Sequence, residues 1–122
     1  MKTIFLVDDS ITMLMSLESV LKRNNLNVVT ATSGAEALQK IPAARPDLII
    51  TDLNMPSMDG ITLIKEIKKM SAMRFKPVLM LTTESQGTKR NEAKAAGATG
   101  WLVKPVKPEE LMAVIKQVVP GA

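Results

Sequence analysis

Hydrophobic residues follow two patterns that alternate along this chain. Five short segments are strand-like: residues 3–7, 27–31, 48–51, 78–82 and 100–103. Four of them are apolar without alternation, which is typical of parallel strands covered on both faces. The segment 27–31 is more mixed, so we expect it at an edge of the sheet.

Between these segments, apolar residues recur every three or four positions, as they do on one face of a helix. The first, third and last of these segments carry Leu14, Leu17 and Leu21; Leu63, Ile67 and Met70; and Leu111, Ile115 and Val118. Ser33 and Glu36 form a capping box for the second helix, and Asp59 is placed to cap the third. Gly97 is placed to end the fourth helix and Pro108 to start the fifth.

Five such β–α units predict a single α/β domain that spans residues 1–122. Its sheet should be open, parallel and doubly wound, with right-handed crossovers and helices on both faces. The length suits one domain, and no stretch resembles a linker. Binding sites in such sheets lie beyond the carboxyl ends of the strands, so the chemistry is expected there.

Composition narrows the possible chemistry. With 46% hydrophobic and 23% charged residues the chain is an ordinary globular sequence. It has no cysteine, which excludes disulfides and thiolate metal sites, and no histidine, the usual general base. No signal peptide or membrane span is evident, so we expect a cytoplasmic protein without membrane insertion.

The net charge of +4 raises the question of nucleic-acid binding. The bases are scattered, apart from a modest cluster at Lys65, Lys68, Lys69, Arg74 and Lys76. One Trp, two Phe and no Tyr offer no platform for stacking bases. Solvated helix faces explain most of this charge, and no nucleic-acid partner is expected.

Polar residues follow four of the predicted strands. They are Asp8 and Asp9 after the first, Asp52 after the third, Thr82 at the end of the fourth and Lys104 after the fifth. Each has an ordinary explanation when taken alone: Asp9 or Ser10 could cap a helix, and Asp52 could end its strand in a turn. If the sheet is right, however, three carboxylates converge at one edge.

Such a cluster is costly without a partner. Two carboxylates ~5 Å apart repel by roughly 3 kcal/mol at an effective dielectric near 20, against a total stability of about 5–15 kcal/mol. The cluster needs protonation or a bound cation. Oxygen ligands without histidine or cysteine favour a hard cation, above all Mg²⁺, which keeps coordination places for phosphate oxygens.

A phosphoryl site with Asp52 as potential nucleophile follows from this set of groups. The chain lacks the GxxxxGK[ST] loop of nucleoside triphosphatases and the GxGxxG turn of dinucleotide-binding folds. A Mg²⁺-dependent phosphohydrolase of the haloacid-dehalogenase type is an alternative. It would require Asp-x-Asp at one strand end, whereas here the pairs are Asp8-Asp9 and Asp52-x-Asn54.

Four segments carry a resemblance to a known family: FLVDDS, DLIITDLNMPSMDG, VLMLTTES and AAGATGWLVKP. In order and spacing the chain resembles a response-regulator receiver domain along nearly its whole length. It is most similar to the stand-alone chemotaxis regulators of the CheY type. The resemblance implies the flavodoxin-like (βα)5 fold with strand order 2-1-3-4-5.

The resemblance also implies roles for individual residues. Asp52 corresponds to the phosphoacceptor, which takes the phosphoryl group from a phosphohistidine of a histidine kinase. Asp9 and Asp52 would ligate Mg²⁺ directly, Asp8 largely through water, and Asn54 through its backbone carbonyl. The same constellation would orient a water molecule for dephosphorylation.

Further positions match the family around the phosphate. Lys104 would pair with the phosphate and Thr82 would hydrogen-bond to it. Trp101 stands at the position of the aromatic switch residue, usually Tyr or Phe. Lys104-Pro105 corresponds to a cis peptide bond, and Asn54 and Glu84 correspond to positions that tune dephosphorylation, here toward a short-lived phosphoprotein.

Signal output is expected by protein docking. The face of the fourth helix, fifth strand and fifth helix carries Lys89, Arg90, Lys94 and Trp101. The expected partners of a monomeric signalling protein, rather than an enzyme, are a histidine kinase, a phosphatase and a flagellar motor switch. The chain ends soon after the fifth helix, so no DNA-binding output domain is expected. A receiver-type binding module that works without phosphorylation is an alternative.

Overall fold

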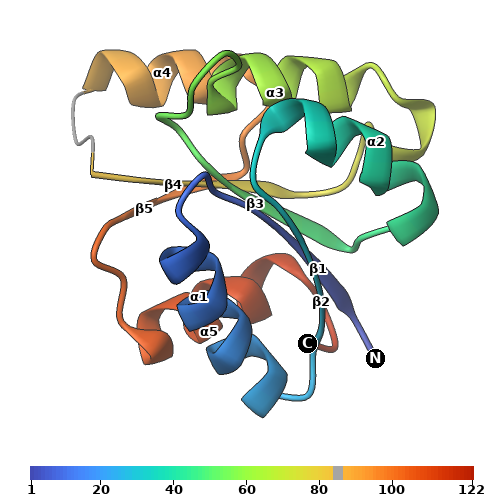
Figure 1. Ribbon diagram of the computed structural model, residues 1–122, viewed down its shortest axis with the longest axis vertical. Coiled ribbons are helices and arrows are strands. Elements are labelled where there is room, and N and C mark those ends of the chain that lie inside the picture. The colour runs from blue at the N-terminus through green and yellow to red at the C-terminus, as the bar shows by residue number, and fades with distance from the viewer. Residues whose placement is uncertain (84–86) are drawn as a thin grey trace.

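The computed structural model describes residues 1–83 and 87–122. Within them, five parallel strands form one sheet in the order β2-β1-β3-β4-β5 (Figure 1). The strands are β1 (Thr3–Val7), β2 (Asn27–Ala31), β3 (Leu48–Asp52), β4 (Val78–Thr82) and β5 (Gly100–Val103). The predicted fold and strand order are confirmed.

Helices cover both faces of the sheet. The helices are α1 (Ile11–Arg23), α2 (Gly34–Ala44), α3 (Gly60–Lys68), α4 (Gly87–Ala96) and α5 (Pro108–Val118), with a 3₁₀ turn, η1, at Ser71–Met73. In Figure 1, α1 and α5 lie on one side of the sheet and α2, α3 and α4 on the other. None of the helices in the described part of the chain is both long and apolar enough to cross a bilayer.

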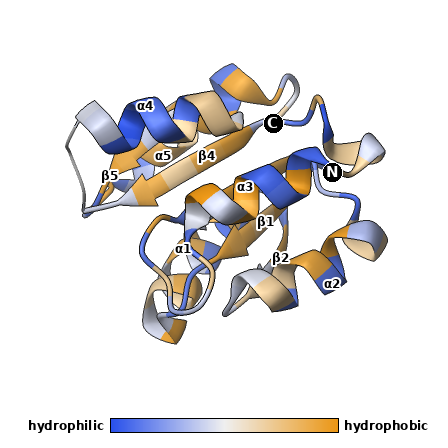
Figure 2. Ribbon diagram, turned by 90° about the horizontal axis from the view of Figure 1, so that it is seen from above, coloured by the Kyte–Doolittle hydropathy of each residue, from blue (hydrophilic) through white to orange (hydrophobic). Residues whose placement is uncertain are grey.

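Two apolar cores flank the sheet because the side chains of each strand alternate between its faces. Ile4 and Leu6 of β1 pack in the core under α1 and α5, while Phe5 and Val7 pack in the core under α2 and α3. Figure 2 shows the strands mostly in hydrophobic colours and the helices banded. The unbroken apolar runs of β1, β3 and β4 therefore mark strands covered on both faces.

One strand departs from the prediction. The edge position of β5 follows the predicted strand order, but its apolar run is expected to be covered on both faces, and Val103 is 37% exposed. Hydrophobicity alone does not distinguish a central strand from an edge strand with a half-open face. The other edge strand is β2, as its mixed pattern predicted.

Helix ends match the capping signals. Ser33 accepts a hydrogen bond from the Glu36 N–H, as the predicted capping box requires, whereas the Glu36 carboxylate accepts from the N–H of Thr32, one residue before the cap. The hydrogen bond from the Thr32 backbone is the main reason that the pKa of Glu36 is lowered. Gly97, with a φ of 118°, ends α4 in a conformation that favours glycine.

Candidate metal and phosphoryl site

The end of β1 delivers two carboxylates to the carboxyl edge of the sheet. The Asp8 N–H donates to the Ala31 carbonyl, and the Asp8 carboxylate accepts from the Ser10 N–H at 2.9 Å. Ser10 caps α1 by accepting from the Met13 N–H at 3.2 Å. Since Ser10 is the cap, Asp9 is not needed for that purpose, and its side chain is exposed.

Asp52 is the last residue of the central strand β3. The backbone beyond it is anchored, because the Leu53 N–H donates to the Leu81 carbonyl and the Gly60 N–H donates to the Leu53 carbonyl at 2.8 Å. Asp59 caps α3 by accepting from the Thr62 N–H at 2.8 Å. Of the two acids in this segment, Asp52 stands at the carboxyl edge of the sheet and Asp59 caps a helix.

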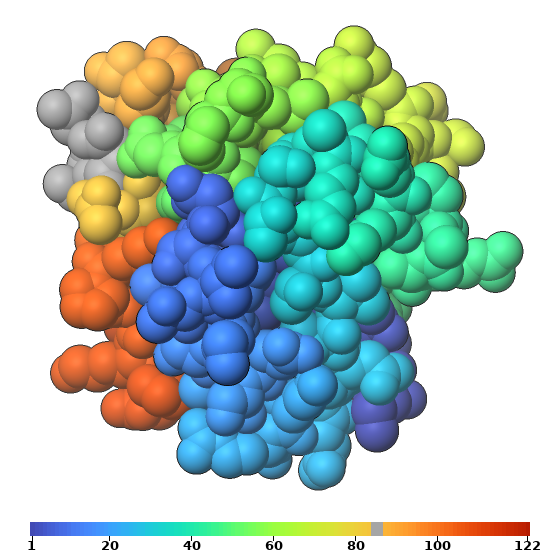
Figure 3. All heavy atoms as spheres, in the orientation of Figure 1, coloured from blue at the N-terminus to red at the C-terminus, as the bar shows by residue number. Residues whose placement is uncertain are grey.

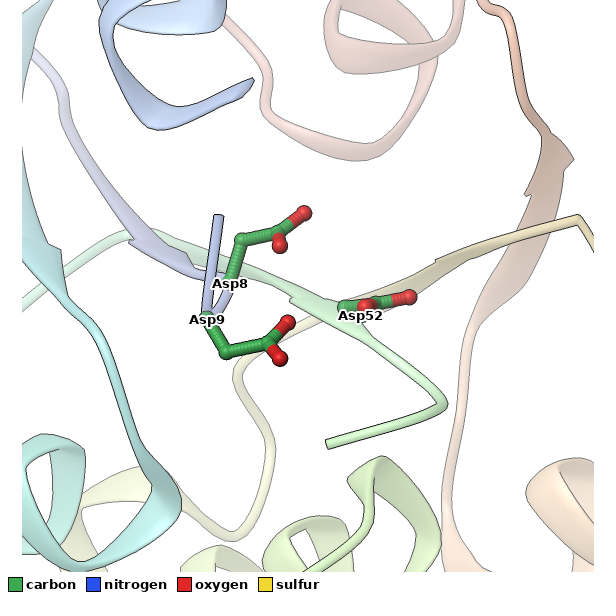
Figure 4. A group of neighbouring side chains, drawn as sticks. All are labelled: Asp8, Asp9 and Asp52. Carbon is green, nitrogen blue, oxygen red and sulfur yellow. The ribbon is translucent and has the colours of Figure 1, made fainter. Parts of the chain in front are cut away.

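The three carboxylates of Asp8, Asp9 and Asp52, here called the acidic rim, come together in space (Figure 4). Each offers one oxygen, and these oxygens lie within 4.8 Å of one another. Asp8 is 2% and Asp52 7% exposed, so water screens their repulsion poorly. A donor set made only of carboxylate oxygens fits a hard divalent cation such as Mg²⁺ or Ca²⁺.

Lys104 places a positive charge against the acidic rim. Its Nζ lies 3.0 Å from Asp8 Oδ2 and 3.4 Å from Asp52 Oδ1. Burial alone would lower the pKa of Lys104, but the hydrogen bond to Asp8 and the charges of both acids raise it above its usual value. The ammonium therefore stays protonated at neutral pH. The Lys104-Pro105 peptide bond that follows is cis.

The pKa of Asp52 is raised even though Lys104 is close. Burial is the largest cause, and the neighbouring Asp8 charge adds to it, so together they outweigh the attraction of Lys104 and a hydrogen bond from the Asn54 backbone. The two partners of this ion pair therefore both have raised pKa values. For Asp52, burial and the Asp8 charge therefore outweigh the one counter-charge within reach among the described residues, Lys104.

We expect Asp52→Asn to be more stable than the native chain at neutral pH in a chelator, by on the order of 1 kcal/mol. A raised folded-state pKa means that native stability is lost as pH rises through that pKa. The advantage of the amide should therefore shrink as pH falls and the native carboxyl becomes protonated. Urea unfolding at a series of pH values tests this, and a pH-independent difference would contradict it.

Asn54 and Thr82 lie together beside the rim. The Asn54 side-chain amide donates to the Thr82 hydroxyl at 3.4 Å, and Thr82 is fully buried at the end of β4. Asn54 lies in the loop after β3, and Thr82 ends the neighbouring strand β4. Glu84, which the sequence placed with Asn54, lies outside the described residues.

The residues expected at the docking face are only partly gathered. Arg90, Lys94 and Trp101 line one shallow cavity of about 270 Å³, and the Arg90 guanidinium lies 5.6 Å from the centre of the half-buried Trp101 ring. Lys89 is not among the lining residues and forms an ion pair with Glu92 at 3.6 Å. The stacking of Arg90 holds a cation over the indole.

Two exposed apolar side chains beside the site were missed from the sequence. Ile11 is 64% and Met15 65% exposed on the first turns of α1, which begins two residues after Asp9. They stand one turn apart, on a different face from the buried Leu14 and Leu17. The signal was present, since both are apolar residues that do not fit the leucine stripe of this helix.

Comparison with known proteins gives one consistent result. The model of the response regulator receiver domain family matches residues 4–116. The chain is 35% identical to PilG of Pseudomonas aeruginosa, covering 97% of this chain and 87% of PilG, and 36% identical to the chemotaxis protein CheY of Bacillus subtilis, covering 93% and 94%. It also spans about half the length of several transcriptional regulators. The structure of the chemotaxis protein CheY4 of Vibrio cholerae superposes with a TM-score of 0.94 at 45% identity, covering 97% of this chain and 98% of that one.

Proposed function

The chain belongs to the response regulator receiver domain family of two-component signalling, and on this premise we propose that Asp52 accepts a phosphoryl group from a histidine kinase in a Mg²⁺-dependent reaction. The observation that carries the proposal is the placement of Asp52 within the acidic rim and 3.4 Å from Lys104. A nucleophilic carboxylate, a set of cation ligands and a fixed ammonium are thus gathered at the carboxyl edge of one sheet.

The residues of the chain have distinct tasks in this reaction. An Asp52 carboxylate oxygen attacks the phosphorus of the phosphohistidine; the new O–P bond forms as the P–N bond breaks, and the imidazole leaves with the bond's electron pair. Lys104 stabilises the negative charge on the transferring group, and Thr82 donates its hydroxyl to a phosphoryl oxygen. Such transfer depends mostly on positioning and charge, which a rigid strand end supplies.

Mg²⁺ fits the same site. Asp9 and Asp52 would hold it directly, with the Asn54 carbonyl as a further ligand and Asp8 acting through water. When bound, the ion neutralises part of the charge of the acidic rim and of the incoming phosphoryl group. The oxygen-only donor set of the rim supports this assignment.

The output proposed for the phosphorylated protein is docking, as a signalling protein rather than as a classical enzyme. A phosphoryl group adds about −1.5 to −2 charges next to Thr82 and Lys104. Movement of Thr82 toward it would bias the α4-β5-α5 face, where Arg90, Lys94 and Trp101 meet, between two states. Similarity to CheY and CheY4 supports a chemotaxis-type target such as a flagellar motor switch, in the cytoplasm.

The test is the intact mass of the protein after incubation with acetyl phosphate. We expect one phosphoryl adduct that needs Mg²⁺ and that does not form on Asp52→Asn, with a change in Trp101 fluorescence as it accumulates. Asp59→Asn is the matched control, since Asp59 is an acid of the same loop that only caps α3. Absence of a Mg²⁺- and Asp52-dependent adduct would overturn the proposal.

The exposed side chains of Ile11 and Met15 predict where the phosphodonor docks. A donor that brings its phosphohistidine to Asp52 must cover the start of α1, where both side chains are exposed. We expect Ile11→Asp to slow transfer from a phosphorylated kinase domain about tenfold or more, while transfer from acetyl phosphate stays within about twofold. Equal slowing with both donors would show damage to the site itself.

A further inference from the structure

A groove lies at the end of the molecule opposite the acidic rim. It has a volume of about 700 Å³ and is formed by the end of α2 and the turn that follows α3. Its apolar lining includes Ile41, Pro42, Met70 and Met73. Both segments lie at the right-hand edge of Figures 1 and 3, whereas β4 runs from this edge toward Thr82 at the rim.

Four basic side chains surround this groove, and of these only Lys76 has an acidic partner among the described residues. Arg45 and Lys76 line it, and Arg74 and Lys65 are exposed in the adjoining segments. Among the residues that the structure describes, no acid lies within 4.0 Å of the charged groups of Arg45, Arg74 or Lys65. Lys76 lies at a loose 3.9 Å from Asp47, whose other carboxylate oxygen accepts from the Thr3 N–H.

The helix dipole explains only part of this charge. Lys65 and Lys68 stand in the last turn of α3, where a base is favoured, and the Lys68 ammonium is bound to the Arg74 and Lys76 carbonyls at 3.2 and 2.6 Å. Arg45 is the C-cap of α2, where a base is likewise favoured, whereas Arg74 and Lys76 lie beyond the last turn of α3. Arg45 and Arg74 are exposed and have no ion pair among the described residues, so their positive charges are accessible to a ligand.

Two local features suggest contact with a partner rather than with water. Phe75, between Arg74 and Lys76, is 92% exposed, the most exposed large apolar side chain of the described residues. Arg45 caps α2 in the left-handed conformation, with φ 46° and ψ 59°. A side chain other than Gly or Asn costs roughly 1–2 kcal/mol there, and such strain concentrates at functional positions.

We propose that this basic groove binds an acidic segment of a partner protein through an apolar side chain flanked by carboxylates. The concave methionine and proline lining accommodates an inserted side chain, since methionine adapts to irregular shapes. A flat anionic membrane would use the charges and Phe75 but not the cavity. The groove is separate from the phosphoryl site, because its lining residues Pro46 and Lys76 precede β3 and β4, whereas Asp52 and Thr82 end these strands.

The test uses protein with ¹³C-labelled methionine methyl groups. The first probe is a short fluorescent peptide in which leucines recur at helical spacing among glutamates; the second has serine in place of each leucine. We expect saturable binding of the leucine peptide, with shifts confined to the Met70 and Met73 methyl signals, and binding of the serine peptide weaker by about tenfold or more.

Charge reversal supplies the matched variants. Arg45→Glu and Arg74→Glu should each weaken binding of the leucine peptide about tenfold, while Lys107→Glu, an exposed base near the start of α5 with the same change of net charge, should not. Asp52→Asn should bind like the native chain, which separates this site from the phosphoryl site. Unchanged thermal unfolding verifies that the variants are folded.

Several results would overturn the proposal. If both peptides bound equally well, the leucines would not contribute to binding. If Lys107→Glu weakened binding as much as Arg45→Glu or Arg74→Glu, the effect would come from net charge alone and not from this groove. Failure of the leucine peptide to shift Met70 or Met73 would place any binding elsewhere. Binding to phosphatidylglycerol vesicles without binding to either peptide would identify the surface as a membrane contact instead.

Discussion

Replacing Lys104 by methionine is expected to slow phosphoryl acceptance from acetyl phosphate by about 10²–10³-fold at saturating Mg²⁺, the usual cost of losing one preorganised donor to a transition state. Its Nζ contacts both Asp8 and Asp52, and its raised pKa keeps it charged throughout the working range. Methionine keeps an unbranched side chain of nearly the same length but removes the charge and the hydrogen bond to Asp8. The time course of the intact-mass adduct measures the effect.

Two controls separate this effect from damage to the fold. Lys104→Arg keeps the charge but spreads it over a planar group, so we expect a partial loss. Lys104→Met leaves Asp8 and Asp52 without their counter-charge, so it should be less stable than native in a chelator and recover when Mg²⁺ is added. An adduct rate close to native at saturating Mg²⁺ would remove Lys104 from the mechanism.

The layout of this site could be predicted from the sequence because each functional residue stands at or directly after the end of a strand. Each apolar run is followed by its functional group, so a parallel sheet brings Asp8, Asp52 and Lys104 to one edge whatever the details of packing. The pairing of strands needed only the alternation of elements and the family resemblance. Caps such as Asp59 were equally local, since a cap and its partner stand three residues apart.

What depended on packing between distant segments was not predictable. The sequence left open whether Asp9 or Ser10 caps α1, because both residue types serve equally well. It predicted the pairing of Lys104 with phosphate but not its contact with Asp8, which spans 96 positions. The basic groove also went unseen, since it arises only when the end of α2 and the turn after α3 meet.

Gly60→Ala is expected to destabilise the protein by about 2–3 kcal/mol, although alanine is the better helix former. A methyl carbon added at Gly60 would collide with the backbone carbonyl oxygen of Asp52. The same carbon would lie 2.9 Å from Met80 Sδ and 3.0 Å from Leu53 Cα. Two of these neighbours are backbone at the end of the central strand, so they cannot move aside as a flexible side chain can. The thermal midpoint should fall by roughly 5–15 °C.

Phosphoryl acceptance should fall as well, because the group that must yield to the new methyl is the backbone of the acceptor itself. A displacement of Asp52 by about 1 Å is enough to cost on the order of 100-fold in rate. Gly87→Ala is the matched control: it is a glycine at the start of another helix, with no described atom within 4 Å of the added carbon, and both stability and acceptance should stay near native. If Gly60→Ala proved as stable and as active as Gly87→Ala, the close approach of α3 to the Asp52 backbone would not be what fixes the acceptor in place.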